Sequence, residues 1–198
     1  MIAQPHLFPE DAREAGRAAW GVFSDCTDGT DCKDPYCQGR PYRYLLAVPT
    51  GVDNERIALG VFANPSTATP AELDPTLTRW RNYCRDWGFG WSWTVNVRAW
   101  RETNPELVPP DPLAIGPAND RHIVQAALGA ELVVCGWGLL GGERGPVALD
   151  LIRRAGKVPH ALKLTKDGSP EHPRYLRADL KPFPMHSEIT MGQKGTKT

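Results

Sequence analysis

The chain has 198 residues, of which 41% are hydrophobic and 23% are charged, as in an ordinary globular domain with one core. Lys plus Arg and Asp plus Glu number 23 each, so the zero formal net charge excludes a general electrostatic attraction for nucleic acid. No stretch approaches the roughly 18 apolar residues of a membrane span, and the N-terminus lacks the features of a secretion signal. We therefore expect a soluble, cytoplasmic protein without a membrane partner.

Residues 1–41 are expected to form a helix over Glu10–Trp20 and then a loop rich in cysteine and aspartate. Three thiolates could hold zinc or an iron–sulfur cluster with a fourth ligand from elsewhere, although their spacing is not that of CxxC pairs. The interleaved aspartates could instead favour Ca²⁺, which prefers oxygen ligands. A polar surface loop without metal is the third interpretation. The cysteines are Cys26, Cys32 and Cys37, and the aspartates are Asp25, Asp28, Asp31 and Asp34.

Two apolar runs open the main domain. Tyr42–Val48 and Arg56–Phe62 are predicted to be strands that pair as a hairpin through the turn-rich segment between them. Pro65 lacks the amide proton that a central strand needs, so the chain is expected to leave the sheet there.

Helices and strands alternate from that point. The sequence predicts a helix from Asp74 to Gly88, a strand over Trp91–Val97 and a proline-rich loop over residues 98–117. Then follow a helix capped by Asn119 and ending near Leu128, a strand over Glu131–Cys135, a helix over Pro146–Ala155 and a strand over His160–Leu164. This order predicts a three-layer α/β/α sandwich with a central, mainly parallel sheet. A single α/β domain over residues 42–184 and a frayed tail over residues 185–198 are expected.

Ligands of open α/β sheets bind beyond the carboxyl ends of the strands, and four segments are predicted to converge there. They are Asn64–Thr67, Asn96–Arg98, the glycine loop after Cys135, and residues 167–176.

Three polar side chains in these segments suit chemistry. The amide of Asn64 can orient a water molecule or donate to an oxyanion, but the same Asn-Pro-Ser-Thr sequence can also be a simple Asx turn. Asn96 can read a planar amide or base edge through its paired donor and acceptor, or it can satisfy neighbouring backbone. His172, between Glu171 and Pro173, can donate a proton or hydrogen bond to a leaving group, or lie exposed in its loop.

Two further patterns point to nucleotides. Basic residues near the predicted rim could bind phosphates, or could be scattered solubilising charge; they are Arg98, Arg101, Lys163, Lys166, Arg174 and Arg177. Gly136–Gly141 matches GxGxxG between a strand and a helix, which indicates a dinucleotide site as a competing hypothesis. Its position late in the chain and the bulk of Trp137 weaken that hypothesis.

The order of motifs resembles a bacterial and phage family labelled domain of unknown function sixteen forty-three, over about Arg43–Leu176. The resemblance carries no established activity. The runs that carry it are Asn64–Ala68, Asp74–Thr76, Trp87–Gly90, Asn96, Thr103–Pro105, Gly116–Asp120, Trp137–Gly138 and Thr165–Leu176.

The same order of motifs is more distantly similar to the uracil-DNA glycosylase superfamily. This resemblance implies that Asn64 holds a water molecule, that Asn96 reads a base edge and that His172 stabilises the departing base. It also implies a wedge at Tyr175 or Leu176. The sequence departs from the superfamily at Phe62, where a glycine is usual, and at Arg174, which replaces the serine of its His-Pro-Ser loop.

The leading hypothesis is therefore an enzyme that hydrolyses a nucleobase N-glycosidic bond, in DNA or in a nucleotide or nucleoside, without a required cofactor. Asn64 and His172 are its expected catalytic residues. A non-catalytic nucleotide or nucleic-acid binding module and a dinucleotide-dependent enzyme remain alternatives. The expected substrate-binding residues are Pro65, Ser66, Thr67, Asn96, Arg98, Gly138, Lys166, Arg174, Tyr175 and Leu176.

Overall fold

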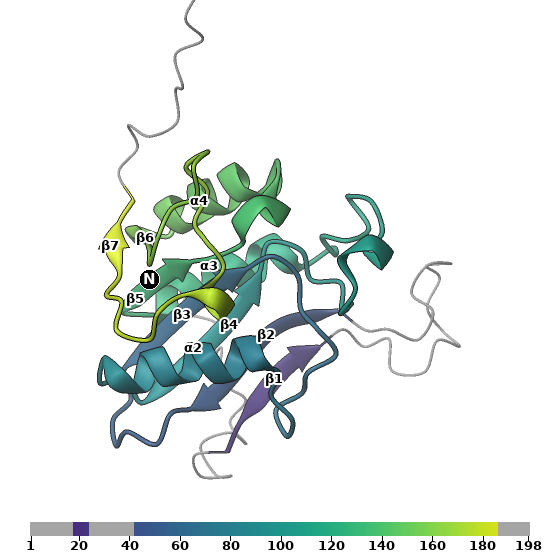
Figure 1. Ribbon diagram of the computed structural model, residues 1–198. Coiled ribbons are helices and arrows are strands. Elements are labelled where there is room, and N and C mark those ends of the chain that lie inside the picture. Colours follow the sequence, from purple (N-terminus) through teal and green to yellow (C-terminus); the bar gives the residue numbers. More distant parts are fainter. Residues whose placement is uncertain (1–17, 24–41, 186–198) are drawn as a thin grey trace, which may run out of the picture.

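The computed structural model describes residues 18–23 and 42–185 as a mixed α/β fold built on one seven-stranded sheet (Figure 1). The strands lie in the order β1-β2-β4-β3-β5-β6-β7. Within these ranges no helix has the length and hydropathy needed to cross a bilayer. The strands are β1 (Trp20–Phe23), β2 (Arg43–Pro49), β3 (Ile57–Phe62), β4 (Trp91–Asn96), β5 (Leu132–Cys135), β6 (Pro159–Ala161) and β7 (Phe183–Pro184), and the helices are α2 (Pro75–Asp86), α3 (Asn119–Gly129) and α4 (Arg144–Arg154).

The predicted hairpin between the first two apolar runs is wrong. Both runs are strands, but β4 lies between them, antiparallel to β2 and parallel to β3. All six residues of β4 are buried, so this strand needs a hydrogen-bonding partner on each edge. The chain between β2 and β3 is long enough to cross the roughly 10 Å occupied by two strand spacings. Local turn signals therefore predicted the strands but not their pairing.

The four central strands β4, β3, β5 and β6 are parallel, and the strands outside them are antiparallel. The sheet is therefore mixed rather than mainly parallel. Trp20, expected at the end of a helix, begins β1 instead: it pairs with Ala47, and its ring packs edge-on against Trp93 with centroids 5.9 Å apart. Residues 18 and 19 are not helical either, and residues 10–17 of that expected helix lie outside the described residues.

Helices cover both faces of the sheet (Figure 1). On one face, α2 packs Trp80 and Tyr83 against Phe62 and Val134. The helix begins where the sequence predicted, and Asp74 caps it: its carboxylate accepts a hydrogen bond from Leu77 N at 2.8 Å. On the other face, α3 and α4 pack against the larger cluster, with Ile123, Ala126, Ala148 and Ile152 meeting Leu59, Val61 and Val95.

The strand order has a direct consequence for ligand binding. The four parallel strands lie side by side in the order β4-β3-β5-β6. The chain therefore goes from β3 to β4 on one side, and then returns past β3 to β5 on the other side. The helix after β3 covers one face, and the helix after β5 covers the other. A crevice at such a reversal is the usual binding place of doubly wound sheets, and here it lies beyond the carboxyl ends of β3 and β5.

Asn119 was predicted to cap α3, but it lies inside the helix, and Ala118 stands at the cap without a side-chain hydrogen bond. The Asn119 side chain is fully buried, and its amide donates to Asn96 O at 2.9 Å and to Val97 O at 3.1 Å. It therefore fixes the end of β4, from which Asn96 projects. Further along, β7 pairs with β6 just before the predicted tail, whose residues from His186 on lie outside the described ranges.

We expect Asn119→Ala to lower the free energy of unfolding by about 1–3 kcal/mol, because two buried carbonyls each lose a donor, although Val97 O keeps the one from Arg144 Nε at 3.2 Å. Urea denaturation measures this loss. Asn104→Ala is the matched control, since Asn104 is exposed and caps only a short turn, so its loss should stay within about 1 kcal/mol. Equal stabilities of the two variants would contradict the role given to Asn119.

Candidate functional site

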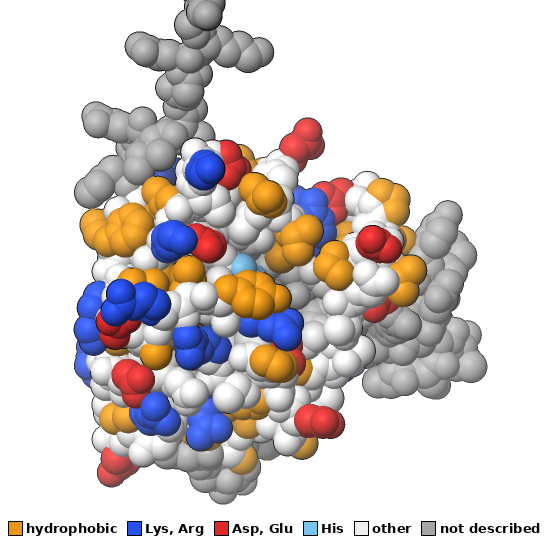
Figure 2. Space-filling view, in the orientation of Figure 1, with side chains coloured by type: hydrophobic (Ala, Val, Ile, Leu, Met, Phe, Trp, Pro, Cys, Tyr) orange, Lys and Arg blue, Asp and Glu red, His pale blue; other side chains and the backbone are white. Residues whose placement is uncertain are grey.

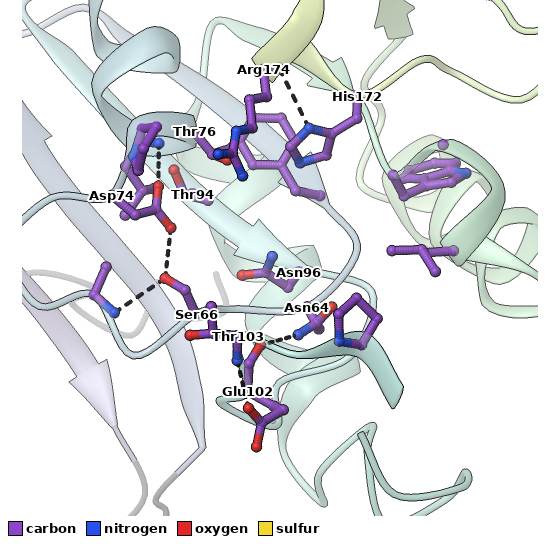
Figure 3. A pocket seen from close by; sticks show the side chains of 18 of the residues that line it. Asn64, Ser66, Asp74, Thr76, Thr94, Asn96, Glu102, Thr103, His172 and Arg174 are labelled. Carbon is purple, nitrogen blue, oxygen red and sulfur yellow. Dashed lines mark hydrogen bonds between the residues drawn. The ribbon is translucent and has the colours of Figure 1, made fainter. Parts of the chain in front are cut away.

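A cavity of about 980 Å³ lies beyond the carboxyl ends of β3, β4 and β5, within the size range of small-molecule sites. Asn64, Asn96 and His172 all line it, although they come from segments far apart in the sequence (Figure 3). Thr94 from β4, Trp137 after β5 and the first turn of α2 complete much of the wall. The predicted convergence of loops on one rim therefore agrees with the structure.

Asn64 is held by the backbone on the far side of the cavity. Its Nδ2 donates to Glu102 O at 2.7 Å and more weakly to Pro65 O at 3.4 Å, while Glu102 N donates to Pro65 O at 2.8 Å. Because only the amide nitrogen can donate to a carbonyl, this contact fixes the orientation of the side chain. Asn64 is thus joined to a distant loop rather than to its own turn, and its Oδ1 is oriented away from Glu102 O as a potential acceptor.

Asn96 ends β4 and is 2% exposed. Its Oδ1 is buried without a hydrogen-bond partner. Since almost all buried polar atoms in proteins are paired, an unpaired one in a cavity wall marks a place where a ligand or water completes the bonding.

His172 enters the cavity from the loop before a short 3₁₀ turn, Pro173–Tyr175. Its Nδ1 accepts a long hydrogen bond, 3.4 Å, from Arg174 N, which leaves the proton on Nε2 of the neutral ring. Burial lowers the pKa of this imidazole; the Asp74 carboxylate raises it by a smaller amount, and Arg174 lowers it. The ring is therefore neutral at pH 7 and can donate a hydrogen bond through Nε2.

A hydroxyl–carboxylate pair forms another wall. Ser66 Oγ donates to Asp74 Oδ2 at 2.6 Å, while Asp74 Oδ1 caps α2 (Figure 3). The sequence patterns indicated Asp74 only as the start of a helix, and they did not point to Thr94, Glu102 or Arg43 as cavity residues. Period-two spacing could have revealed Thr94, which lies two residues before Asn96 and so faces the same side of the sheet.

The other predicted binding residues divide into two groups. Thr67, Gly138, Arg174 and Tyr175 also line the cavity, and Tyr175 is 80% exposed. Pro65 and Lys166 do not line it, and Arg98 faces a smaller adjoining cavity of about 260 Å³.

Leu176 cannot be a wedge in its observed position. It is 5% exposed and packs in the cluster beneath α2, and its carbonyl accepts a hydrogen bond from Arg79.

The glycines of the GxGxxG match accommodate the protein's own side chains. A Cβ at Gly136 would lie 2.9 Å from Pro173, and one at Gly141 would lie 2.1 Å from Trp137 Cδ1. Close approach by these neighbours, rather than by a pyrophosphate, explains Gly136 and Gly141, while Gly138 has a backbone φ of +59° that favours glycine. The chain after β5 also forms a 3₁₀ turn, Gly138–Gly141, before α4 begins at Arg144. This geometry does not favour the dinucleotide hypothesis.

Most of the cations expected to form a phosphate-binding rim already make ion pairs or hydrogen bonds within the protein. Arg98 pairs with Asp111 at 2.9 Å, Lys163 with Glu171 at 2.9 Å and Arg177 with Asp179 at 2.6 Å. Arg101 donates to Thr67 O at 2.7 Å. The rim is therefore a weak surface for a polyanion.

The structure does not describe the proposed metal site of Cys26, Cys32 and Cys37, because residues 24–41 lie outside the described ranges. Within residues 18–23 and 42–185, no three His, Cys, Asp or Glu side chains come together in a way that could hold a metal ion. The two cysteines of this part, Cys84 and Cys135, are buried free thiols, and burial raises the pKa of both.

Residues 43–174 match the family described as Protein of unknown function (DUF1643), and the chain belongs to this family. The match contains most of the residues that line the cavity. No curated protein and no solved structure matches the chain.

We expect Gly141→Ala to lower the free energy of unfolding by about 1–3 kcal/mol, because the new methyl group overlaps the Trp137 ring. Leu139→Ala is the control: Leu139 lies in the same turn but is 73% exposed, so its loss should stay within about 0.5 kcal/mol. Urea denaturation should show the larger loss for Gly141→Ala. The reverse order would contradict the packing role given to this loop.

The burial of His172 predicts a pH dependence. The pKa of His172 in the folded protein lies below the unfolded value of about 6.5. The unfolded state therefore binds more protons, and the protein loses stability as the pH falls from about 6.5 to the folded-state pKa. His172→Gln should lose less stability between pH 7 and pH 5 than the wild type, as measured by urea denaturation. Asn104→Ala, which changes an exposed turn and no titratable group, is the control and should lose as much stability over this pH range as the wild type. An NMR titration that placed the pKa of His172 at or above 6.5 would overturn this expectation.

Proposed function

We propose that the cavity hydrolyses the N-glycosidic bond of a nucleobase, on a fold related to the uracil-DNA glycosylase superfamily that the motif order resembles. The observation that carries this proposal is the meeting of Asn64, Asn96 and His172 around one cavity wide enough for a planar heterocycle. The reversal of strand order between β3 and β5 supports it, because it opens the crevice where doubly wound folds bind nucleotides.

The base would lie over Asn96, at the end of β4. Its amide pairs a donor with an acceptor at the spacing of a base edge, and the unpaired, buried Oδ1 is the atom that a bound base or a bridging water would satisfy. The rings of Phe62 and Trp137 also line the cavity and supply flat apolar surface beside this amide.

Asn64 would position the attacking water through Oδ1. Cleavage of a glycosidic bond passes through an oxocarbenium-like state, in which C1′ is so electrophilic that water needs a fixed position more than a strong base. The hydrogen bond from Asn64 Nδ2 to Glu102 O supplies that rigidity.

His172 would donate a hydrogen bond from Nε2 to the departing base. The C1′–N bond breaks with its electron pair going to the base, and the water oxygen bonds to C1′. The two protons of the water end on the base nitrogen and on the new sugar hydroxyl, so atoms and charges balance. A neutral imidazole suits this role, since it stabilises a developing anion without needing to be charged first. The proposed reaction requires no cofactor.

The test is release of free base, detected by chromatography, from oligonucleotides carrying uracil, mismatches or modified bases, and from nucleosides and nucleotides. Asn64→Ala should lower kcat by about 10²-fold, since the water loses its position, with little change in substrate binding. His172→Phe should lower kcat by about 10²–10³-fold through loss of a donor to the leaving group. Asn104→Ala, in an exposed turn, is the control.

The alternative of a non-catalytic binding module uses the same cavity and makes a different prediction. In that case the wild type and Asn64→Ala would be equally inert while both bound nucleotide or nucleic acid. If the wild type releases base and both Asn64→Ala and His172→Phe release it at the same rate, the roles proposed for these two residues are refuted.

A further inference from the structure

One charged side chain in the cavity wall has no part in the proposed hydrolysis. Arg43 begins β2 and is 2% exposed, yet it lines the cavity. Its Nη1 donates to Ala68 O at 3.1 Å, while its Nε is buried without a hydrogen-bond partner. Among the described residues it forms no ion pair, unlike the rim cations Arg98, Lys163 and Arg177.

A bulge in β2 accompanies this placement of Arg43. The pairing of β1 with β2 shifts by one residue, so that Val22 faces Leu45 and Phe23 faces Arg43. In a regular strand Arg43 and Leu46 would point to opposite faces. Here Leu46 packs against Leu77 of α2, and Arg43 lines the same cavity as Leu77. Bulges near binding sites commonly redirect a side chain in this way.

A buried guanidinium without a carboxylate partner is unfavourable in the empty protein. Burial lowers the pKa of Arg43 to about 10; the Asp74 carboxylate raises it by a smaller amount, and Arg101 lowers it. Arg43 therefore stays charged at pH 7. Asp74 acts on this charge without forming an ion pair with Arg43; its two oxygens accept hydrogen bonds from Ser66 and Leu77.

We propose that Arg43 binds the terminal phosphate of a mononucleotide, which makes a nucleoside monophosphate the substrate class of the cavity; this inference rests on the proposed function. A guanidinium presents parallel N–H donors that match two phosphate oxygens, and one phosphate would supply both the charge and the acceptors that Arg43 lacks. A cavity of about 980 Å³ is large enough for base, sugar and phosphate together.

The surroundings favour a mononucleotide over a nucleic-acid strand. Arg43 is 2% exposed, which favours a terminal phosphate over one that continues as chain on both sides. Four acidic residues, Glu72, Asp74, Glu102 and Glu171, also line the cavity, so a strand that brings several phosphates past them meets more repulsion than a single phosphate held by Arg43. Around the histidine in Figure 2, Lys and Arg side chains are interspersed with acidic and hydrophobic ones rather than gathered along one path. Tight binding to a strand needs several unpaired cations, because each phosphate contact releases counterions.

The experiment compares five nucleoside 5′-monophosphates with their nucleosides and with single- and double-stranded oligonucleotides of the same bases. Calorimetry measures binding, and chromatography measures base release. We expect the wild type to prefer at least one monophosphate to its nucleoside by about 10- to 100-fold, the usual strength of a charged hydrogen bond. Arg43→Met should abolish that preference and leave nucleoside binding unchanged.

Two controls separate phosphate binding from a structural role. Arg98→Met removes a surface cation that is paired with Asp111, and it should keep the full preference for the monophosphate. Arg43→Lys keeps the charge but loses the paired donors, and it should restore part of the preference. Thermal unfolding of each variant without ligand shows whether the protein is folded. If Arg43→Met were unfolded, the partial preference in folded Arg43→Lys would carry the test.

The outcomes distinguish this inference from the proposed function. Release of base from oligonucleotides alone would overturn the mononucleotide while sustaining hydrolysis. Binding of a monophosphate that depends on Arg43, without base release from any substrate, would sustain the phosphate site and refute hydrolysis. Three results would overturn the role of Arg43. They are equal binding and cleavage of nucleoside and monophosphate, a preference for the monophosphate that Arg43→Met retains, and no binding of any monophosphate.

Discussion

The helices that follow β3 and β5 leave the sheet on opposite faces, and the cavity exists because of this divergence. Among residues 18–23 and 42–185, no α-helix covers the carboxyl ends of the two strands between the diverging segments. The loops that continue from them, Asn64–Thr67 and Gly136–Gly141, therefore become walls rather than buried connections. The third wall comes from the loop around His172, which reaches the same place from the far side of β6.

Backbone contacts keep these walls in fixed positions. Asn119 ties the end of β4 to α3, and Glu102 ties the proline-rich loop to both Pro65 and Asn64. The glycines after β5 allow Trp137 and Pro173 to pack closely, which brings the His172 loop against the sheet. The polar groups of the cavity are thus oriented before any ligand arrives, as electrostatic catalysis requires.

Two polar side chains in the wall of this cavity lack a bonding partner for one of their groups among the described residues. Asn96 has a buried oxygen without a donor, and Arg43 has a buried charge without a carboxylate. Proteins seldom keep such groups in their cores, and both lie in the wall of the same cavity. A ligand with a hydrogen-bonding ring at one end and an anion at the other would satisfy both, which is why the base and the phosphate are assigned to different parts of one molecule.

The sequence by itself determined most elements and the convergence of the loops, because periodic apolar residues, caps and prolines act locally. It marked Asn64 and Asn96 because each comes at the end of a predicted strand, and His172 because Pro170 and Pro173 restrict the loop around it. Only the tertiary structure decided the insertion of β4 between β2 and β3, the burial of Leu176 and the position of Arg43. Strand pairing, and the bulge that turns Arg43 inward, depend on contacts between segments far apart along the chain, which no local pattern encodes.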